Sequence, residues 1–145
     1  MIELLEKYKS KGHFEFTSFD SLEQKCNAPT DKGGVYLIYE IRNNYRRLIY
    51  IGSSGQRNAD GSLKIRRSGL GGMKDRLVNG HHPGFGKIKR KKAWPEMMRN
   101  QRIEKIAVYW WVTFDSEFKD FPTDVEKMIF NTYILKYGAK PKWHS

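Results

Sequence analysis

Two tyrosines beside glycines are the first residues in this sequence whose types and placing could do chemistry. They are Tyr36, in Gly34-Val35-Tyr36, and Tyr50, in Tyr50-Ile51-Gly52. A phenol donates or accepts a hydrogen bond and, once ionised, can take a proton. Both tyrosines lie in short apolar runs, so each also fits an ordinary place in a hydrophobic core.

Side chains that handle phosphate, protons and metal ions follow the tyrosines along the chain. Arg76 lies in an expected helix over residues 70–79, and His81 and His82 come shortly after it. Glu126 lies in the first turns of a late helix. An arginine can neutralise phosphate charge, and a carboxylate can bind a hard divalent cation. Glu126 alone also fits a structural role, since the helix dipole stabilises a carboxylate near a helix N-terminus.

The elements that would position these residues are those of a small α/β (α+β) domain. Strands are expected over residues 35–41, 48–51 and 103–114, with a further short strand over 13–17, and helices over 2–9, 70–79 and 122–137. Asn43-Asn44 suits the turn of the first hairpin, because asparagine tolerates positive φ. The sequence therefore predicts one domain over residues 1–145, with a three-stranded, mostly antiparallel sheet flanked by helices. Residues 1–30 are expected to form an N-terminal extension that packs on this domain.

The charge of the chain favours an anionic partner. It carries 27 Lys+Arg against 16 Asp+Glu, a formal net charge of +11. Nucleic acid and an anionic membrane surface both attract such a protein. No apolar run approaches the ~20 residues of a membrane span, and the N-terminus lacks the pattern of a signal peptide. We therefore expect a cytoplasmic protein that binds nucleic acid and no membrane, the alternative being a basic protein without such a partner.

In combination, these motifs resemble those of the GIY-YIG nuclease family. The two tyrosine motifs correspond to the pair that names the family, and they occur here as Gly34-Val35-Tyr36 and Tyr50-Ile51-Gly52. Residues 71–77, 124–126 and 137–143 follow in the order expected for the family's arginine helix, its glutamate and its Pro-x-Trp ending. The resemblance runs from about Lys32 to the end of the chain.

The resemblance implies the GIY-YIG nuclease fold and a metal-dependent phosphodiesterase. Glu126 would hold one Mg²⁺ or Mn²⁺ ion, and Arg76 would stabilise charge on the scissile phosphate. Tyr36 would act as general base or orient the attacking water, with Tyr50 in support. A free phenol has a pKa near 10, so Tyr36 would need a cation nearby to lose its proton.

Several assignments stay open at this point. Many relatives place a lysine directly after the second motif, where this chain has Ser53, so the cation beside Tyr36 could be Lys64 or Lys74. The family often adds a histidine or tyrosine after its arginine, and His81 and His82 are both candidates, with His81 taken as the catalytic residue. Arg66 or Arg67 could replace Arg76 as the catalytic arginine. At the end of the chain His144 stands in place of the usual asparagine.

The predicted partner is DNA, contacted by the basic loop after the hairpin and by the basic segment over residues 87–92. The expected contacts are Arg57, Lys64, Arg66, Arg67, Lys74, Lys87, Lys89 and Arg90. A stand-alone endonuclease that resembles type II restriction enzymes fits this size best, and cutting both strands would favour a homodimer. The alternatives are a nonspecific or phage-type nuclease, and a non-catalytic DNA-binding protein that retains the fold. Cys26 is the single cysteine, so a multi-cysteine zinc domain is excluded.

Overall fold

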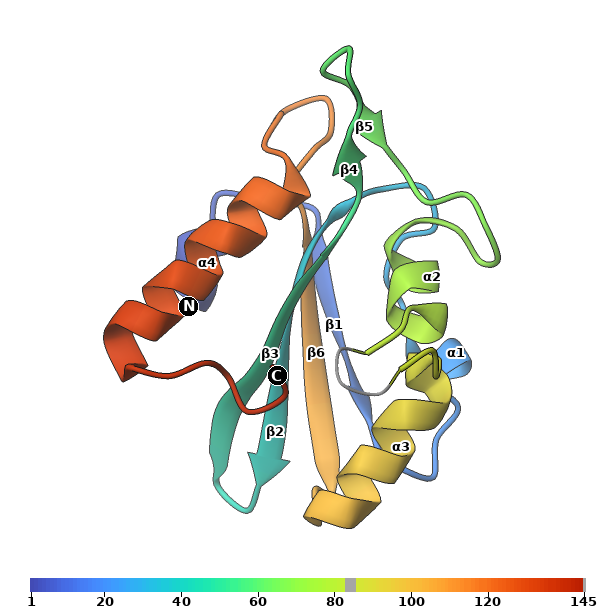
Figure 1. Cartoon of the computed structure of the whole chain (residues 1–145), viewed down its shortest axis with the longest axis vertical. Coiled ribbons are helices and arrows are strands. Elements are labelled where there is room, and N and C mark those ends of the chain that lie inside the picture. Colours follow the sequence, from blue (N-terminus) through green and yellow to red (C-terminus); the bar gives the residue numbers. More distant parts are fainter. Residues whose placement is uncertain (83–85, 145) are drawn as a thin grey trace.

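A four-stranded antiparallel sheet organises the computed structural model, which describes residues 1–82 and 86–144 (Figure 1). The strands lie in the order β1-β6-β2-β3. Their bounds are β1 Lys11–Phe16, β2 Gly34–Arg42, β3 Tyr45–Ser54 and β6 Lys105–Val112. The α+β class is confirmed, but the expected number of strands in the sheet is wrong. The fourth strand, β1, comes from the N-terminal segment and pairs with β6, so this segment is part of the sheet.

The hairpin of β2 and β3 carries both tyrosine motifs, as expected. Asn43 has a φ of 48° at the turn, which is the conformation for which asparagine was favoured. Tyr36 lies opposite Gly52 in the register of the two strands. The partner of β2 on its other side is β6, so the strand of the first motif lies inside the sheet and β3, with the second motif, lies at its edge.

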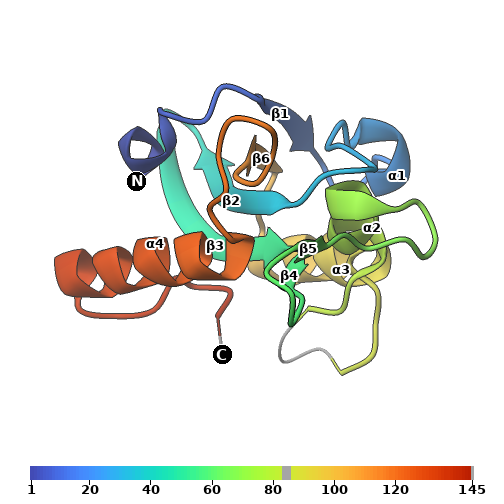
Figure 2. The same ribbon diagram turned by 90° about the horizontal axis from the view of Figure 1, so that it is seen from above.

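Helices cover both faces of the sheet (Figure 2). On one face lies α4, Pro122–Tyr137, which begins at a proline and ends at Gly138 with a φ of 73°, as predicted. The other face carries α1 Leu22–Lys25, α2 Gly72–Asn79 and α3 Arg90–Gln101. Alternate residues of β2 supply the two hydrophobic cores: Tyr36 and Ile38 face α2 and α3, and Val35 and Leu37 face α4.

Two elements depart from the sequence-based expectation near the basic segments. The second half of the basic segment over residues 87–92 belongs to α3, Arg90–Gln101, which contains Pro95. The loop after the second motif contains a two-stranded ribbon, β4 Gln56–Arg57 and β5 Leu63–Lys64, which extends beyond the sheet (Figure 1).

At the N-terminus, the expected helix over residues 2–9 is a single 3₁₀ turn, η1 Ile2–Leu5. Among the described residues, no helix has both the length and the apolar character that a membrane crossing requires.

Candidate active site

An open pocket of about 360 Å³ lies at the end of β3, between α2 and the start of α4. It brings together Arg76 and Glu126, two residues from different helices that the motif reading predicted to act together. The lining residues are Ser53, Ser54, Gly55, Gln56, Lys64, Arg66, Arg76, Thr123 and Glu126. The pocket thus combines one carboxylate with three cationic side chains, a composition suited to a phosphate group.

Glu126 points its carboxylate into surroundings that are partly shielded from water. Burial raises the pKa of Glu126 above its ordinary value, while a hydrogen bond from Ser53 and the positive charges of Arg76 and Arg90 act in the opposite direction. Ser53 therefore does more than replace the lysine expected after the second motif. Its hydroxyl stabilises the charged form of the predicted metal ligand.

The position of Arg76 follows from how α2 begins. Gly71 and Gly72 have φ values of 82° and 54°, and a Cβ atom on Gly72 would lie 2.5 Å from the carbonyl carbon of Thr30. Only glycine permits this approach. The first N–H groups of α2 donate to carbonyls of the preceding loops, including Met73 N to Lys32 O at 3.2 Å and Lys74 N to Pro29 O at 3.0 Å. These bonds fix the helix that carries Arg76.

Arg66 lines the pocket but is held by a carboxylate. Its Nε donates to Asp75, which is 2% exposed and also accepts from Asn79 and the Leu70 N–H. Burial raises the pKa of Asp75, but these hydrogen bonds and the Arg66 charge outweigh it and leave the pKa lowered. Arg76 has no such carboxylate partner among the ion pairs of the described residues. The geometry therefore favours Arg76 over Arg66 as the arginine available to a ligand.

The two tyrosines lie beneath the surface, with their rings stacked at a centroid distance of 6.4 Å. Tyr36 has no exposed area and Tyr50 is 5% exposed. A Cβ atom on Gly52 would lie 2.4–2.6 Å from ring carbons and the hydroxyl of Tyr36, so the glycine of the second motif makes room for the phenol of the first. Burial raises the pKa of Tyr50 to about 12, an effect that nearby Tyr36 reinforces and Arg90 opposes.

Arg90 occupies a place that the sequence did not suggest. We expected it on the surface as a DNA contact, but its side chain is completely buried and points toward the tyrosines. That expectation is wrong because Arg90 is the first residue of α3 and turns inward, whereas Lys91 and Lys92 remain exposed. Its guanidinium donates to the Tyr36 hydroxyl at 2.7 Å and to the Tyr50 hydroxyl at 3.3 Å.

Of the two candidate histidines, His82 rather than His81 contacts a predicted catalytic tyrosine. The His82 ring lies 5.0 Å from the Tyr50 ring, whereas His81 is exposed and pairs with Lys89 in a short bridge. His82 Nδ1 accepts from Trp94 Nε1–H at 3.3 Å, so its Nε2–H donates to the Trp143 carbonyl at 3.1 Å. Burial lowers the pKa of His82 to about 4, so this ring is neutral and fully bonded near pH 7.

The C-terminal segment packs against Tyr50. His144 stacks on the Tyr50 ring at 4.3 Å, and its Nε2 accepts from the Ile51 N–H at 3.0 Å. Burial also lowers the pKa of His144 to about 4. His144, at the position where the resemblance leads us to expect asparagine, therefore makes a defined bond to Ile51 of the second tyrosine motif.

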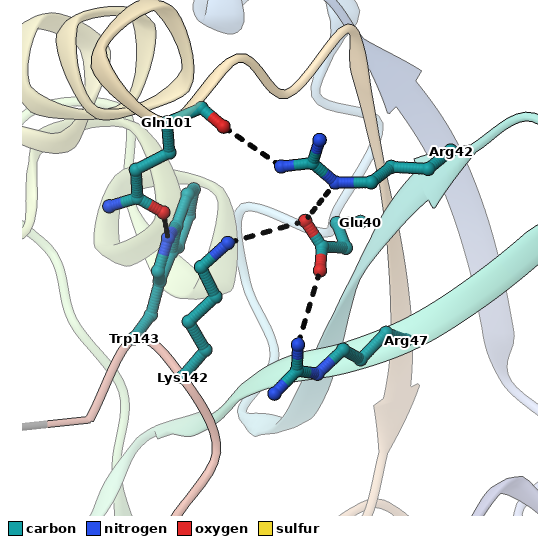
Figure 3. Close-up of polar contacts among 6 residues, drawn as sticks. All are labelled: Glu40, Arg42, Arg47, Gln101, Lys142 and Trp143. Carbon is teal, nitrogen blue, oxygen red and sulfur yellow. Dashed lines mark hydrogen bonds and ion pairs between the residues drawn. The ribbon is translucent and has the colours of Figure 1, made fainter.

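A buried carboxylate, Glu40, attaches this segment to the sheet (Figure 3). Glu40 is 1% exposed and pairs with Arg42 at 3.0 Å, Lys142 at 3.6 Å and Arg47 at 3.9 Å. Gln101 accepts from Arg42 through its backbone carbonyl and from Trp143 Nε1–H through its side chain. These contacts hold the segment that places His144 against Tyr50.

The other predicted DNA contacts have different positions. Lys64 and the exposed Arg67 lie on the basic surface that continues from the pocket. Arg57 pairs with Asp124 at 2.9 Å and lies 3.8 Å from the centre of the Phe121 ring. Lys74 is half-buried and does not line the pocket, whereas Lys87 and Lys89 are exposed just before α3.

Glu126 is the one pocket carboxylate that could hold a metal ion. Within the described residues, no group of three or more histidine, cysteine, aspartate or glutamate side chains has the spacing of a metal site. Mg²⁺ often binds through one or two carboxylates, several waters and substrate phosphates. The donor set of Glu126, the Ser53 hydroxyl and water fits such a weakly held ion.

Comparisons with protein-family models, with curated proteins and with solved structures gave no match to this chain. The site therefore has to be interpreted from its own geometry. Sequence reasoning missed Ser53 as a partner of Glu126 and Arg90 as the cation between the tyrosines. A signal for Arg90 was present, because Ala93, Trp94, Met97 and Met98 form the apolar side of a helix that begins at residue 90.

Proposed function

We propose that this protein is a metal-dependent DNA endonuclease of the GIY-YIG type, similar to stand-alone type II restriction enzymes. One observation carries the proposal: Arg76 and Glu126, from separate helices, line one open basic pocket, and both act electrostatically on Tyr50, which lies outside the pocket lining. The basic surface of Lys64, Arg66 and Arg67 extends from this pocket and suits a nucleic-acid backbone.

In this mechanism the scissile phosphate lies against Arg76, whose positive charge offsets the charge that develops on the phosphate oxygens. Tyr36 first loses its hydroxyl proton to solvent, and the resulting phenolate takes a proton from the water whose oxygen attacks phosphorus. The bond from phosphorus to the leaving oxygen breaks, and that oxygen takes a proton from solvent. A divalent cation held by Glu126 would supply Lewis-acid polarisation of the phosphate. Because Tyr36 has no exposed area, this role requires that a water reach its oxygen when DNA occupies the pocket.

The charge of the pocket predicts how the metal ion binds. Lys64, Arg66 and Arg76 oppose a cation, and Glu126 is the single carboxylate that attracts it. A dication should therefore bind weakly to the free protein and more tightly once a phosphate group adds negative charge. Titration of Mn²⁺, followed by its paramagnetic effect on water relaxation, should show tighter binding with a short DNA duplex than without it.

A second candidate is a non-catalytic DNA-binding protein, and the burial of both tyrosines favours it. Supercoiled DNA, incubated with Mg²⁺ or with a chelator, separates the two functions. The nuclease predicts metal-dependent cutting that Glu126→Gln abolishes and that Arg99→Gln, an exposed change on α3, leaves intact. Discrete fragments would indicate a restriction enzyme and a smear a nonspecific nuclease. Retarded but uncut DNA with each of Mg²⁺ and Mn²⁺ would refute the nuclease.

Cutting of both strands would further require two such sites on the DNA. A homodimer would supply them, and light scattering of the protein with and without DNA measures whether two chains assemble.

A further inference from the structure

A buried guanidinium lies between the two tyrosines that the proposed mechanism uses. Arg90 has no exposed area, and its two terminal nitrogens donate to the hydroxyls of Tyr36 and Tyr50. Its guanidinium carbon lies 5.4 Å from the centre of the Tyr36 ring and 5.5 Å from that of Tyr50. One cation therefore contacts both phenols at once.

No carboxylate contacts this buried charge in the described part of the chain. Arg90 takes part in none of the ion pairs of the described residues, and its third hydrogen bond goes to the backbone carbonyl of Arg76 at 2.8 Å. Its Nε has no hydrogen-bond partner within residues 1–82 and 86–144. Glu126 acts on Arg90 electrostatically without forming an ion pair with it. A buried charge that no carboxylate contacts is costly, so this cation gains when a group that it does contact becomes negative.

The Tyr36 oxygen is the group best placed to become negative. It accepts the shorter of the two phenol bonds from Arg90, and in the described part of the chain its own hydrogen has no acceptor. A hydroxyl that only accepts, and accepts from a cation, loses little when its proton leaves. Tyr50 lies farther from Arg90, and its proton is retained more strongly because burial raises its pKa to about 12.

We propose that Arg90 is a positioning residue that aims the Tyr36 hydroxyl and supplies the positive charge opposite the Tyr36 phenolate. This inference rests on the proposed function, in which Tyr36 accepts a proton from water. Arg90 thereby takes the part of the lysine for which this chain has Ser53 after the second motif. Neither other candidate does so: Lys64 is exposed on the pocket rim and Lys74 lies half-buried on α2.

The backbone around Arg90 ties this cation to the phosphate-binding helix. The Arg90 N–H donates to the Gly80 carbonyl at 2.9 Å, directly after the end of α2, and the guanidinium reaches back to Arg76. Arg90 therefore couples the place of Tyr36 to the place of Arg76. The start of α3 thereby connects Tyr36, the proposed proton acceptor, with Arg76, the arginine proposed to face the phosphate.

Several charged and titratable groups share this environment and enter the test. Tyr50 on β3 and Arg76 on α2 both contact Arg90, Tyr50 through its hydroxyl and Arg76 through its backbone carbonyl. Glu126 on α4 acts on Tyr50 electrostatically. His82 packs on Tyr50 and is neutral near pH 7, because burial lowers its pKa to about 4. Within residues 1–82 and 86–144, Arg90 is the one side chain that hydrogen-bonds to the Tyr36 oxygen, and its bond to Tyr50 is longer, so removing its charge should act on Tyr36 more than on Tyr50.

Tyrosine ionisation in the protein without DNA tests the inference directly. The side chains would be labelled with ¹³C at Cζ and followed by NMR from about pH 6 to about pH 11, the range around a free phenol's value near 10. Tyr36→Phe and Tyr50→Phe assign the signals, and the exposed Tyr45 serves as reference. Arg90→Gln should move the Tyr36 transition to a higher pH than in the wild-type protein, because a neutral amide no longer stabilises the phenolate. Arg99→Gln should leave the Tyr36 transition unchanged, and the Tyr45 signal should change at the same pH in all three proteins.

Each outcome decides the inference separately from the nuclease. A Tyr36 transition at the same pH in Arg90→Gln as in the wild-type protein overturns the inference, even if the protein cuts DNA. If Arg90→Gln does not fold, Arg90→Lys takes its place, because it keeps the charge but not the two donating nitrogens of the guanidinium. A Tyr36 transition that does not move in Arg90→Lys then overturns the inference. An Arg90-dependent transition in a protein that cuts no DNA would support the cation–phenolate pair and refute the nuclease.

Discussion

Acid should unfold this protein partly through His82. The folded ring is neutral, since Nδ1 accepts from Trp94 and Nε2–H donates to the Trp143 carbonyl. A second proton has to go onto Nδ1, which would then face the Trp94 N–H and break that bond. The ring is also 1% exposed, and burial lowers its pKa from 6.5 to about 4.

The sign of the effect follows from the two pKa values. Between about pH 6.5 and about pH 4 the unfolded chain binds a proton at His82 that the folded protein does not, so stability falls as the pH falls through this window. The difference of 2.5 pH units corresponds to a loss of about 2 kcal/mol at about pH 5 and about 3 kcal/mol at about pH 4.

Urea unfolding, followed by tryptophan fluorescence at about pH 7, 6, 5 and 4, measures this loss. The wild-type protein should lose about 2 kcal/mol more than His82→Gln between about pH 7 and about pH 5, because glutamine does not titrate. The adjacent exposed histidine provides the control, and His81→Gln should follow the wild-type curve. Equal losses in the wild-type protein and in His82→Gln would refute the assignment of His82 as a buried neutral ring.

Three further changes test other contacts of the site. Gly52→Ala should displace the Tyr36 ring and cost about 1–3 kcal/mol by overpacking, measured by thermal unfolding together with cutting; unchanged stability would contradict the packing in the hairpin. Glu40→Gln should cost about 2 kcal/mol by leaving half-buried cations without their carboxylate, measured in urea at neutral pH; a neutral result would show that the C-terminal segment is held by other means. Lys64→Gln should reduce the slope of log affinity for DNA against log salt by about one, whereas Arg57→Gln, which removes a side chain already paired to a carboxylate, should change it little.

The parts of the fold that the sequence predicted depend on local patterns. Alternation and a turn asparagine predicted the β2–β3 hairpin, and a proline with a later glycine predicted the ends of α4. The sequence predicted the edge strand β1 as a short strand but not its place in the sheet, because its partner β6 lies about 90 residues later in the chain. No local sequence pattern predicts a pairing between strands so far apart in the chain.

The candidate site, too, could be predicted only in part from local sequence patterns. Arg76 and Glu126 could be placed together only through a resemblance, and the shared pocket is consistent with that reading. Arg90 was missed, because the lysine- and arginine-rich composition of its segment and the internal proline indicated a solvated surface. This composition outweighed the helical spacing of the apolar residues that follow Arg90. Burial of one of its cations is a tertiary effect that depends on the phenols of β2 and β3.

The two kinds of cation in this protein should respond differently to salt. Lys64, Arg66 and Arg76 line an open pocket, where ions screen charges beyond a Debye length of about 8–10 Å at moderate ionic strength. Arg90 contacts Tyr36 at 2.7 Å with no exposed area, so salt ions cannot enter between them. Under the proposed function, raising the salt concentration should therefore weaken DNA binding while it leaves the hydrogen bond between Arg90 and Tyr36 in place. The pocket cations would then govern how DNA is bound, and Arg90 how the proton acceptor is prepared.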